Sequence, residues 1–196
     1  MGKFPAELRG RWNHNTHYYP LVLAATPCDR ALDVGCGDGL LVRLLAARCR
    51  AVVGVDPWTD PEATTGLGNA TLLAEDFLTA PLDAGSFDLV CSVTAIHHMN
   101  VRAALARMAT LVAPGGRLIV IGVVAYTPLT WLLGGLSIPA HRVMARRRGY
   151  WQHPAPVADP TQTWAQTRRI VRETLPGARF RRRLYWRYSI EWTRPG

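Results

Sequence analysis

The chain has 196 residues, enough for one domain with a sizeable core, and 48% of them are hydrophobic and 19% charged, which excludes a disordered chain. The net charge of +9 is local: residues 140–196 hold thirteen arginines and three acids, whereas residues 1–139 hold ten basic and eleven acidic side chains. We expect most of the clustered arginines to form a solvated surface, with phosphate, carboxylate, nucleic acid or an anionic membrane as alternative partners.

The N-terminus, MGKFPAELRG, has no apolar run and does not resemble a signal peptide. The four cysteines lack CxxC spacing and lie in or beside apolar stretches, as reduced thiols do, so we expect a cytoplasmic protein. An uncharged run of 23 residues, 118–140, is long enough to span a bilayer, but Pro128, the pair Gly134-Gly135 and Pro139 interrupt it. We predict a strand followed by a lid there, with peripheral membrane contact as the alternative.

Residues 1–29 combine Trp12 with two histidines and two tyrosines, which predicts a polar-aromatic helical arm. On a helix, His14, His17 and Tyr18 would share one face. We expect this arm to close over the substrate, which makes Tyr18 a candidate catalytic residue; surface and packing roles are the alternative. No acid or cysteine lies near the two histidines, so we predict no metal site.

Short apolar runs alternate with helical stretches between Ala31 and about Val124. Asn100 is suited to the N-cap position of one of these helices. Continuous apolar strands that alternate with helices predict a parallel sheet covered on both faces. The predicted strands are 31–34, 51–55, 70–74, 87–93 and 117–124, and the predicted helices are about 39–49, a short one after Asp60, and 100–113.

Beyond the fifth strand we predict an insertion, a helix and two strands. Residues 125–158 are rich in Pro, Trp and Arg and are interpreted as a lid, and a helix follows at about 161–175. The two final strands would join near Arg187 at an edge of the sheet, where charges are tolerated. Five side chains of the insertion are expected either to overhang a ligand or to form the core of the lid: Trp131, His141, Tyr150, Trp151 and His153.

The segment ALDVGCGDGLL, residues 31–41, carries the strongest functional signal. After the apolar strand, Gly35, Gly37 and Gly39 let the backbone turn tightly and approach a ligand, and the following helix offers its N-terminal N–H groups. The spacing is GxGxG and not the GxGxxG of dinucleotide-binding proteins, which disfavours a nicotinamide cofactor. A turn that needs glycines for structural reasons alone is the alternative.

Further positions suit a nucleoside ligand. Asp56 closes the second strand, VVGVD, seventeen residues after Gly39, where a carboxylate can accept hydrogen bonds from both ribose hydroxyls. Asp76 and Phe77 follow the third strand, where an acid and an aromatic ring can contact an adenine. The fourth strand runs into paired histidines in FDLVCSVTAIHHM, and LVAPGGRLIVIG supplies a Gly-Gly turn and the fifth strand.

With these segments in order, residues 30–124 resemble the core of the class I methyltransferases that depend on S-adenosylmethionine. The resemblance implies a Rossmann-like three-layer α/β sandwich with a seven-stranded, mostly parallel sheet whose last strand is antiparallel. It also implies one domain over residues 1–196, in which the core 30–124 is flanked by the arm 1–29, the lid insertion 125–158, and the last helix and final strands 159–196.

The resemblance further implies S-adenosylmethionine as cofactor, with S-adenosylhomocysteine as product. The first glycine loop would hold the methionine part of the cofactor, and the acid after the second strand would bind its ribose. The segment after the third strand would contact the adenine, and the fourth strand would line the methyl-donor side. The implied cofactor-binding residues are Asp33, Gly35, Cys36, Gly37, Asp56, Pro57, Asp76, Phe77, Ser92 and Val93.

A sulfonium methyl group is already activated, so the protein must mainly orient an acceptor and exclude water. A base is needed only for a hydroxyl or a protonated amine. His97 and His98 lie just past the fourth strand, and we assign the base to His98 ahead of His97, with orientation of the loop or contact with the cofactor as the alternative. The expected reaction is methyl transfer to a small aromatic, lipophilic or anionic molecule.

Three other functions are alternatives. The arginine-rich surface would suit a nucleic acid or protein acceptor, although the chain lacks both the NPPY-type tetrapeptide of amino-methylating DNA enzymes and an appended nucleic-acid module, which argues against nucleic acid. A regulator or a cyclase would use the same pocket without transferring a methyl group. A nicotinamide dehydrogenase is the third.

Overall fold

The computed structural model describes residues 5–125, 127–152 and 158–196, and strands alternate with helices through its central part. The strands are β1 (Cys28–Val34), β2 (Cys49–Val55), β3 (Ala70–Leu73), β4 (Phe87–Val93), β5 (Val112–Val123), β6 (Arg179–Arg182) and β7 (Arg187–Thr193). The α-helices are α1 (Tyr19–Leu23), α2 (Leu40–Ala46), α3 (Val101–Leu111), α4 (Pro128–Leu133), α5 (Ser137–Arg148) and α6 (Trp164–Thr174). Short 3-10 helices are η1 (Ala6–Leu8), η2 (Thr16–Tyr18), η3 (Pro61–Thr64) and η4 (Ile96–His98).

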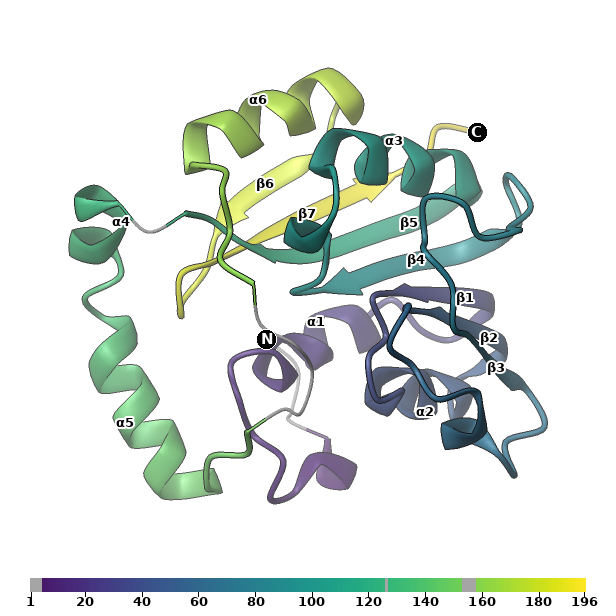
Figure 1. Cartoon of the computed structure of the whole chain (residues 1–196), viewed down its shortest axis with the longest axis horizontal. Coiled ribbons are helices and arrows are strands. Elements are labelled where there is room, and N and C mark those ends of the chain that lie inside the picture. Colours follow the sequence, from purple (N-terminus) through teal and green to yellow (C-terminus); the bar gives the residue numbers. More distant parts are fainter. Residues whose placement is uncertain (1–4, 126, 153–157) are drawn as a thin grey trace.

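The seven strands form one sheet in the order β3-β2-β1-β4-β5-β7-β6 (Figure 1). Strands β1 to β5 run parallel, and β7 is antiparallel to both of its neighbours, β5 and β6. This topology confirms the α/β fold expected from the sequence, with its mostly parallel sheet and antiparallel last strand.

The two final strands do not both lie at the sheet edge. Strand β6 does, and its arginines are exposed, but β7 lies inside the sheet and pairs with β5 from Arg117↔Thr193 to Val123↔Arg187. Tyr188 and Ile190 on β7 are buried in the core that α3 and α6 cover, which suits a strand inside the sheet, whereas the exposed arginines of β6 suit its edge. The expectation of an edge position was therefore right for β6 and wrong for β7.

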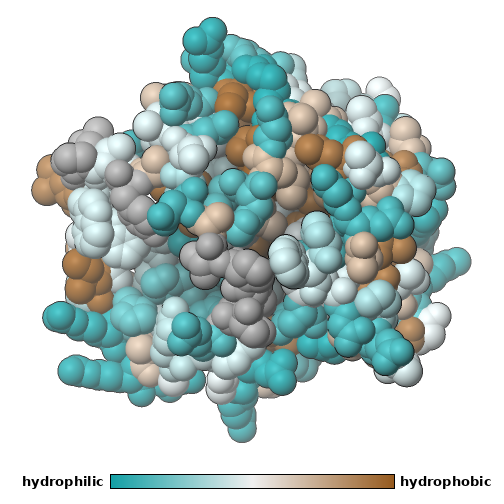
Figure 2. Space-filling view, viewed as in Figure 1, coloured by the Kyte–Doolittle hydropathy of each residue, from teal (hydrophilic) through white to brown (hydrophobic). Residues whose placement is uncertain are grey.

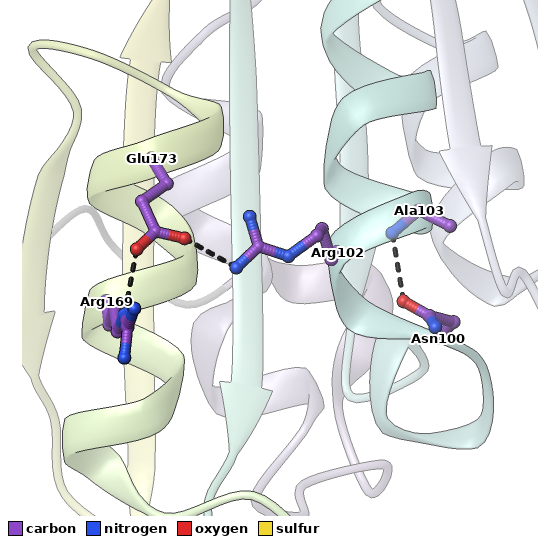
Figure 3. A network of polar contacts seen from close by, with 5 residues as sticks. All are labelled: Asn100, Arg102, Ala103, Arg169 and Glu173. Carbon is purple, nitrogen blue, oxygen red and sulfur yellow. Dashed lines mark hydrogen bonds and ion pairs between the residues drawn. The ribbon is translucent and has the colours of Figure 1, made fainter.

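Helices α3 and α6 cover one face of the sheet (Figure 1). The buried side of α3 includes Leu105 and Met108, which pack in the core between the helices and the sheet. At its start the Asn100 side chain accepts a hydrogen bond from the Ala103 amide at 3.1 Å, which confirms the predicted N-cap. Between the two helices, Glu173 of α6 binds Arg102 of α3 at 2.5 Å (Figure 3). Because this pair is exposed, the apolar packing contributes more to stability than the ion pair.

Helices α1 and α2 cover the opposite face. Strand residues alternate between the two cores, so that Val90 faces the α3 side while the neighbouring Cys91 faces the α2 side. The five apolar residues that α2 buries there are Leu40, Leu41, Val42, Leu44 and Leu45. The apolar strands are therefore covered on both faces, as their composition predicts.

The N-terminal segment is helical only in short pieces, which limits the predicted helical arm. The side-chain oxygen of Asn13 accepts hydrogen bonds from the amides of Asn15 and Thr16, at 2.9 and 2.8 Å. Such a local bond competes with a continuous helix. The 3-10 helix η2 therefore begins at Thr16, and His14 lies outside it.

The insertion after β5 contains α4 and α5, which extend along one side of the molecule (Figure 1). Trp131, Leu132 and Leu136 are exposed there, as are the neighbouring arginines of α5. On the face drawn in Figure 2, polar side chains and apolar patches are interspersed, and no continuous apolar surface is seen. None of the helices in the described ranges has the length and apolar character needed to cross a membrane.

Candidate functional site

A cavity of about 1240 Å³ lies at the edge of the sheet where β1 to β4 end. Its walls come from the loops that follow these strands, from the N-terminal segment, from residues after α5 and from the start of β7. Open parallel sheets bind ligands at this edge. Of the predicted cofactor-binding and catalytic residues, those that line it are Gly35, Gly37, Asp56, Pro57, Asp76, Phe77, Val93, His97 and His98.

Gly35 is fixed by a close approach between two loops. Its φ is +75°, and a Cβ atom built on it would lie 2.0 Å from the Cβ of Ala95, in the loop after β4. Its amide donates to the carbonyl of Val55 at 2.8 Å, which also ties the turn to β2. Only glycine fits such a position, so the wall between β1 and β4 is formed by bare backbone.

Asp56, at the end of β2, faces this glycine turn. One carboxylate oxygen accepts from the Gly37 amide at 3.0 Å and the other from the Trp58 amide at 2.8 Å. A carboxylate has about four acceptor positions, so both oxygens can accept further hydrogen bonds from ligand hydroxyls. The predicted ribose position is therefore occupied by an oriented acid at the cavity wall.

Asp76 and Phe77 both line the cavity after β3, but the ring of Phe77 is turned into the core. Phe77 is 2% exposed, and the Arg107 guanidinium lies 5.5 Å from its ring centroid. Asp76 accepts a hydrogen bond from the Leu78 amide at 2.8 Å, which closes the turn. The acid is thus available at the wall, whereas little of the aromatic surface is open for stacking.

Asp33, Cys36 and Ser92 lie behind the wall and not in it. Burial raises the pKa of Asp33 to about 7, and the Cys91 thiol contacts its carboxyl at 3.7 Å. The Cys36 thiol contacts the Thr59 hydroxyl at 3.7 Å, and the Ser92 hydroxyl is buried with no partner among the described residues. Their assignment as cofactor-binding residues stays a prediction.

The end of β4 is strained at Thr94. Its φ is 59°, a conformation that costs a β-branched residue about 1–2 kcal/mol. The Thr94 amide donates to the Ile121 carbonyl at 2.7 Å, while its side-chain hydroxyl is buried and has no partner in the part of the chain that the structure describes. Thr94 lines the cavity next to Val93, so this hydroxyl suits a hydrogen bond with a ligand.

His97 and His98 lie side by side after β4, with ring centroids 4.2 Å apart, but their environments differ. Burial lowers the pKa of His97 to about 4; the neighbouring His98 acts in the same direction, and a hydrogen bond with the Ala158 backbone opposes it. The Nδ1 atom of His97 is buried and has no partner among the described residues. His98 is exposed at the cavity, so a bound acceptor reaches it more readily than it reaches His97.

Tyr18 is buried at 4% exposure, and its hydroxyl donates to the Leu184 carbonyl at 2.8 Å. Burial raises its pKa far above the usual range. It does not line the cavity, whereas its neighbours in the N-terminal segment, Asn13, His14 and Asn15, do.

Of the residues singled out in the insertion, some line the cavity and others do not. Tyr150 lines the cavity, but Trp131 and His141 do not. His141 contacts His14 through ring nitrogens 3.0 Å apart, and the His14 ring stacks on Tyr185 with centroids 4.4 Å apart. Trp151 is also outside the lining, and the predicted residue His153 lies outside the described residues. No group of three metal-ligating side chains is found in the described ranges.

Sequence reasoning missed two conspicuous lining residues. Trp58 is 77% exposed and follows Asp56 by two positions. A large aromatic residue just past a strand-ending acid was the available signal. Arg187, at the start of β7, also lines the cavity, but only the pairing of β7 with β5 brings it there.

Comparison with known proteins now identifies the family. The family model of a methyltransferase domain matches residues 32–120. An uncharacterised methyltransferase of Mycobacterium tuberculosis is 41% identical over 192 residues, which cover 94% of this chain and 98% of the relative. The chain belongs to the class I methyltransferases.

Solved structures share the fold of this methyltransferase at low sequence identity. A possible exported protein of Bordetella parapertussis superposes with a TM-score of 0.65 at 20% identity, covering 99% of this chain and 71% of that chain. A geranyl diphosphate methyltransferase, solved with GPP and sinefungin, superposes with a TM-score of 0.64 at 13% identity, covering 91% and 78%. These similarities show the Rossmann-like fold, and the methyltransferase relatives show that the chain is an enzyme of this family.

Proposed function

We propose that this methyltransferase binds S-adenosylmethionine at the carboxyl ends of β1 to β3. It would transfer the methyl group to a small molecule held on the other side of β4, toward β5 and β7. The observation that carries the proposal is the placement of Asp56 opposite the Gly35–Gly37 turn at the wall of one cavity. An acid and bare backbone at adjacent strand ends suit the ribose hydroxyls and the methionine part of this cofactor.

Other groups in the cavity support the same ligand. Asp76 offers a carboxylate after β3, and the exposed ring of Trp58 offers a flat surface near the ribose position. The Thr94 hydroxyl, which has no partner among the described residues, follows β4 next to Val93, toward the proposed methyl-donor side. We assign Asp33, Cys36 and Ser92 a supporting role behind the wall, and the ring of Phe77 a packing role.

The volume of the cavity supports a second ligand beside the cofactor. Pockets for one small molecule usually measure about 300–1,000 Å³, and the cavity measures about 1240 Å³. Tyr150 and Gln152, which follow α5, and Asn15 of the N-terminal segment also line this cavity. We therefore propose that residues 125–158 act as a lid over a small aromatic or lipophilic acceptor.

When bound, S-adenosylmethionine supplies an electrophilic methyl group on a sulfonium. The chain then has to orient the acceptor and exclude water, which can lower the barrier by up to roughly 7–11 kcal/mol. For a hydroxyl or a protonated amine, His98 would take the proton from the acceptor, and His97 would orient the loop that carries it. The four free thiols suit a reducing compartment, and we propose the cytoplasm.

Isothermal titration calorimetry tests the proposal directly. The wild-type protein should bind both S-adenosylmethionine and S-adenosylhomocysteine, and Asp56→Ala should weaken both by about tenfold or more, because two charge-assisted ribose contacts are lost. Asp83→Ala, an exposed acid outside the cavity lining, is the matched control and should bind normally. Folded wild-type protein that gives no heat with either compound would overturn the proposal.

A further inference from the structure

Arg187 is held at the far end of the cavity by two neighbours. One terminal nitrogen, Nη2, donates to the side-chain oxygen of Asn15 at 2.9 Å, and the other, Nη1, donates to the Tyr185 carbonyl at 2.9 Å. Because Arg187 pairs with Val123 at the end of β5, its guanidinium lies at the same sheet edge as the loops after β1 to β4. The cation is therefore built into the wall by the N-terminal segment and by the turn before β7.

The charges of the cavity are separated along the sheet. Its carboxylates follow β1, β2 and β3 and belong to Asp38, Asp56, Asp60 and Asp76. Among the lining residues that the structure describes, Arg187 is the only arginine or lysine. Strand β7 lies four positions from β2 in the sheet, which corresponds to about 19 Å at roughly 4.8 Å per strand.

The order of the strands separates the proposed cofactor site from the proposed acceptor site. The proposed cofactor positions lie at the carboxyl ends of β1, β2 and β3, which is the acidic end of the cavity. The loop after β4, which carries His98, lies between this end and Arg187. Arg187 is on the side of β4 that faces away from these positions. Its side of the cavity is the one that would hold the acceptor.

The two groups that accept hydrogen bonds from Arg187 among the described residues, the Asn15 amide and the Tyr185 carbonyl, are neutral. Asn13, Tyr150 and Gln152 contribute further neutral amides and a phenol to the lining of the cavity. Burial lowers the pKa of the adjacent His14 to about 3, and Arg187 itself acts in the same direction, so this ring is uncharged at neutral pH. A fixed guanidinium among neutral hydrogen-bonding groups is suited to bind an oxyanion.

We propose that Arg187 binds an oxyanion, a carboxylate or a phosphate, carried by the methyl acceptor, and so makes this enzyme selective for anionic small molecules. The inference rests on the proposed function and adds a substrate class to it. The same chemistry has a second source, since the cofactor itself carries a carboxylate. The position of Arg187 beyond β4 favours the acceptor, and the experiment separates the two sources.

The cofactor arm of the experiment measures the affinity for S-adenosylhomocysteine by calorimetry in wild type, Arg187→Gln and Arg181→Gln. Arg181 is an exposed arginine of β6 outside the cavity lining, so its variant matches the loss of charge without touching the site. All three proteins should bind S-adenosylhomocysteine equally. A loss confined to Arg187→Gln would assign the oxyanion to the cofactor and overturn the inference.

The acceptor arm uses protein saturated with S-adenosylhomocysteine and follows the Arg187 side-chain signal by NMR. Benzoate and phenyl phosphate at millimolar concentration should shift this signal, and the neutral amide benzamide should not. Arg187→Gln should weaken binding of the anions by about ten- to one-hundredfold, while Arg181→Gln should leave it unchanged.

Asn15→Asp provides a second variant that keeps the arginine. A carboxylate at this position would pair with the guanidinium 2.9 Å away and compete with the anion, so the affinity for benzoate should fall in the same way. If S-adenosylhomocysteine binds but no anion binding depends on Arg187, the inference is wrong and the proposed function stands. If S-adenosylhomocysteine does not bind wild type, it is the proposed function that fails.

Discussion

The Nε2 atom of His14 lies 3.0 Å from the Nδ1 atom of His141, and this contact joins the N-terminal segment to α5 across 127 residues of sequence. In a hydrogen bond between two imidazoles at least one ring must be neutral, because one nitrogen has to accept. Burial is the main cause that lowers the pKa of His14 to about 3 and that of His17 to about 4, and Arg187, Arg148 and His141 reinforce it. The contact between the N-terminal segment and α5 therefore depends on at least one uncharged histidine ring.

Acid should loosen this attachment. Unfolded histidine titrates near pH 6.5, so between about pH 6.5 and 4 the unfolded chain binds more protons than the folded one, and stability falls as the pH is lowered. His14→Phe keeps a ring that can stack on Tyr185 but removes the titrating group. Urea unfolding at pH 7.5 and pH 5 should show a smaller loss for this variant, by about 1–2 kcal/mol after allowance for solvent screening.

Leu132→Phe is the control for that comparison, because Leu132 is exposed on α4 and carries no titrating group. Its pH dependence should equal that of wild type. An equal loss of stability in wild type and His14→Phe would show that the histidine contact does not make the attachment of α5 sensitive to pH.

The glycine turn after β1 should tolerate no side chain. Gly35 and Gly115 share a φ of +75°, but a Cβ at Gly35 would lie 2.0 Å from the Cβ of Ala95, while nothing lies within 4 Å of one at Gly115. Gly115→Ala should therefore cost only the conformational penalty, about 1 kcal/mol. Gly35→Ala should cost about 3 kcal/mol or more in urea unfolding and should abolish cofactor binding. Equal losses in the two variants would contradict the close approach of the two loops.

The core of this fold could be predicted from the sequence because its signals are local. Periodicity located the five parallel strands, and Asn100 marked a helix start that the structure confirms. Asp56 was predictable in the same way, since an acid at the end of a parallel strand must lie at the ligand edge of the sheet.

The remaining parts of the site depend on contacts between distant segments. Arg187 reaches the cavity only because β7 inserts between β5 and β6, and no local pattern specifies that insertion. His14 was expected on a helical face with His17, but the Asn13 side chain starts a different turn and directs it to His141. The ring of Phe77 turned into the core because Arg107 and apolar neighbours cover it there.

Asp33 should make the protein less stable as the pH rises. Its folded pKa is raised to about 7 by burial, while an unfolded aspartate titrates near 3.9, so the folded protein holds the extra proton between these values. Stability from this group is complete below about pH 4 and is lost as the pH rises to 7, by roughly 4 kcal/mol in all. Asp33→Asn keeps an oxygen that can accept from the Cys91 thiol and should remove this loss.

The measurement is the difference between wild type and Asp33→Asn in urea unfolding at pH 5 and pH 8, which cancels the opposite trend of the histidines. Asp83→Asn, at an exposed position, should follow wild type at both values. A difference that does not grow with pH would mean that Asp33 is already ionised in the folded protein.

His98 and His97 should respond differently to replacement by alanine. The exposed ring of His98 lines the cavity, so His98→Ala should lower kcat by roughly 10²–10⁴-fold for an acceptor that must lose a proton, with little change in stability. His97 is half-buried and bonded to the Ala158 backbone, so His97→Ala should mainly lower the unfolding free energy and affect kcat less. The rate of S-adenosylhomocysteine formation, measured against pH with any acceptor that supports turnover, distinguishes the two roles. Loss of the acidic limb of the profile in His98→Ala would identify the base, and unchanged turnover in both variants would remove the assignment, because orientation of the acceptor alone would then account for the reaction.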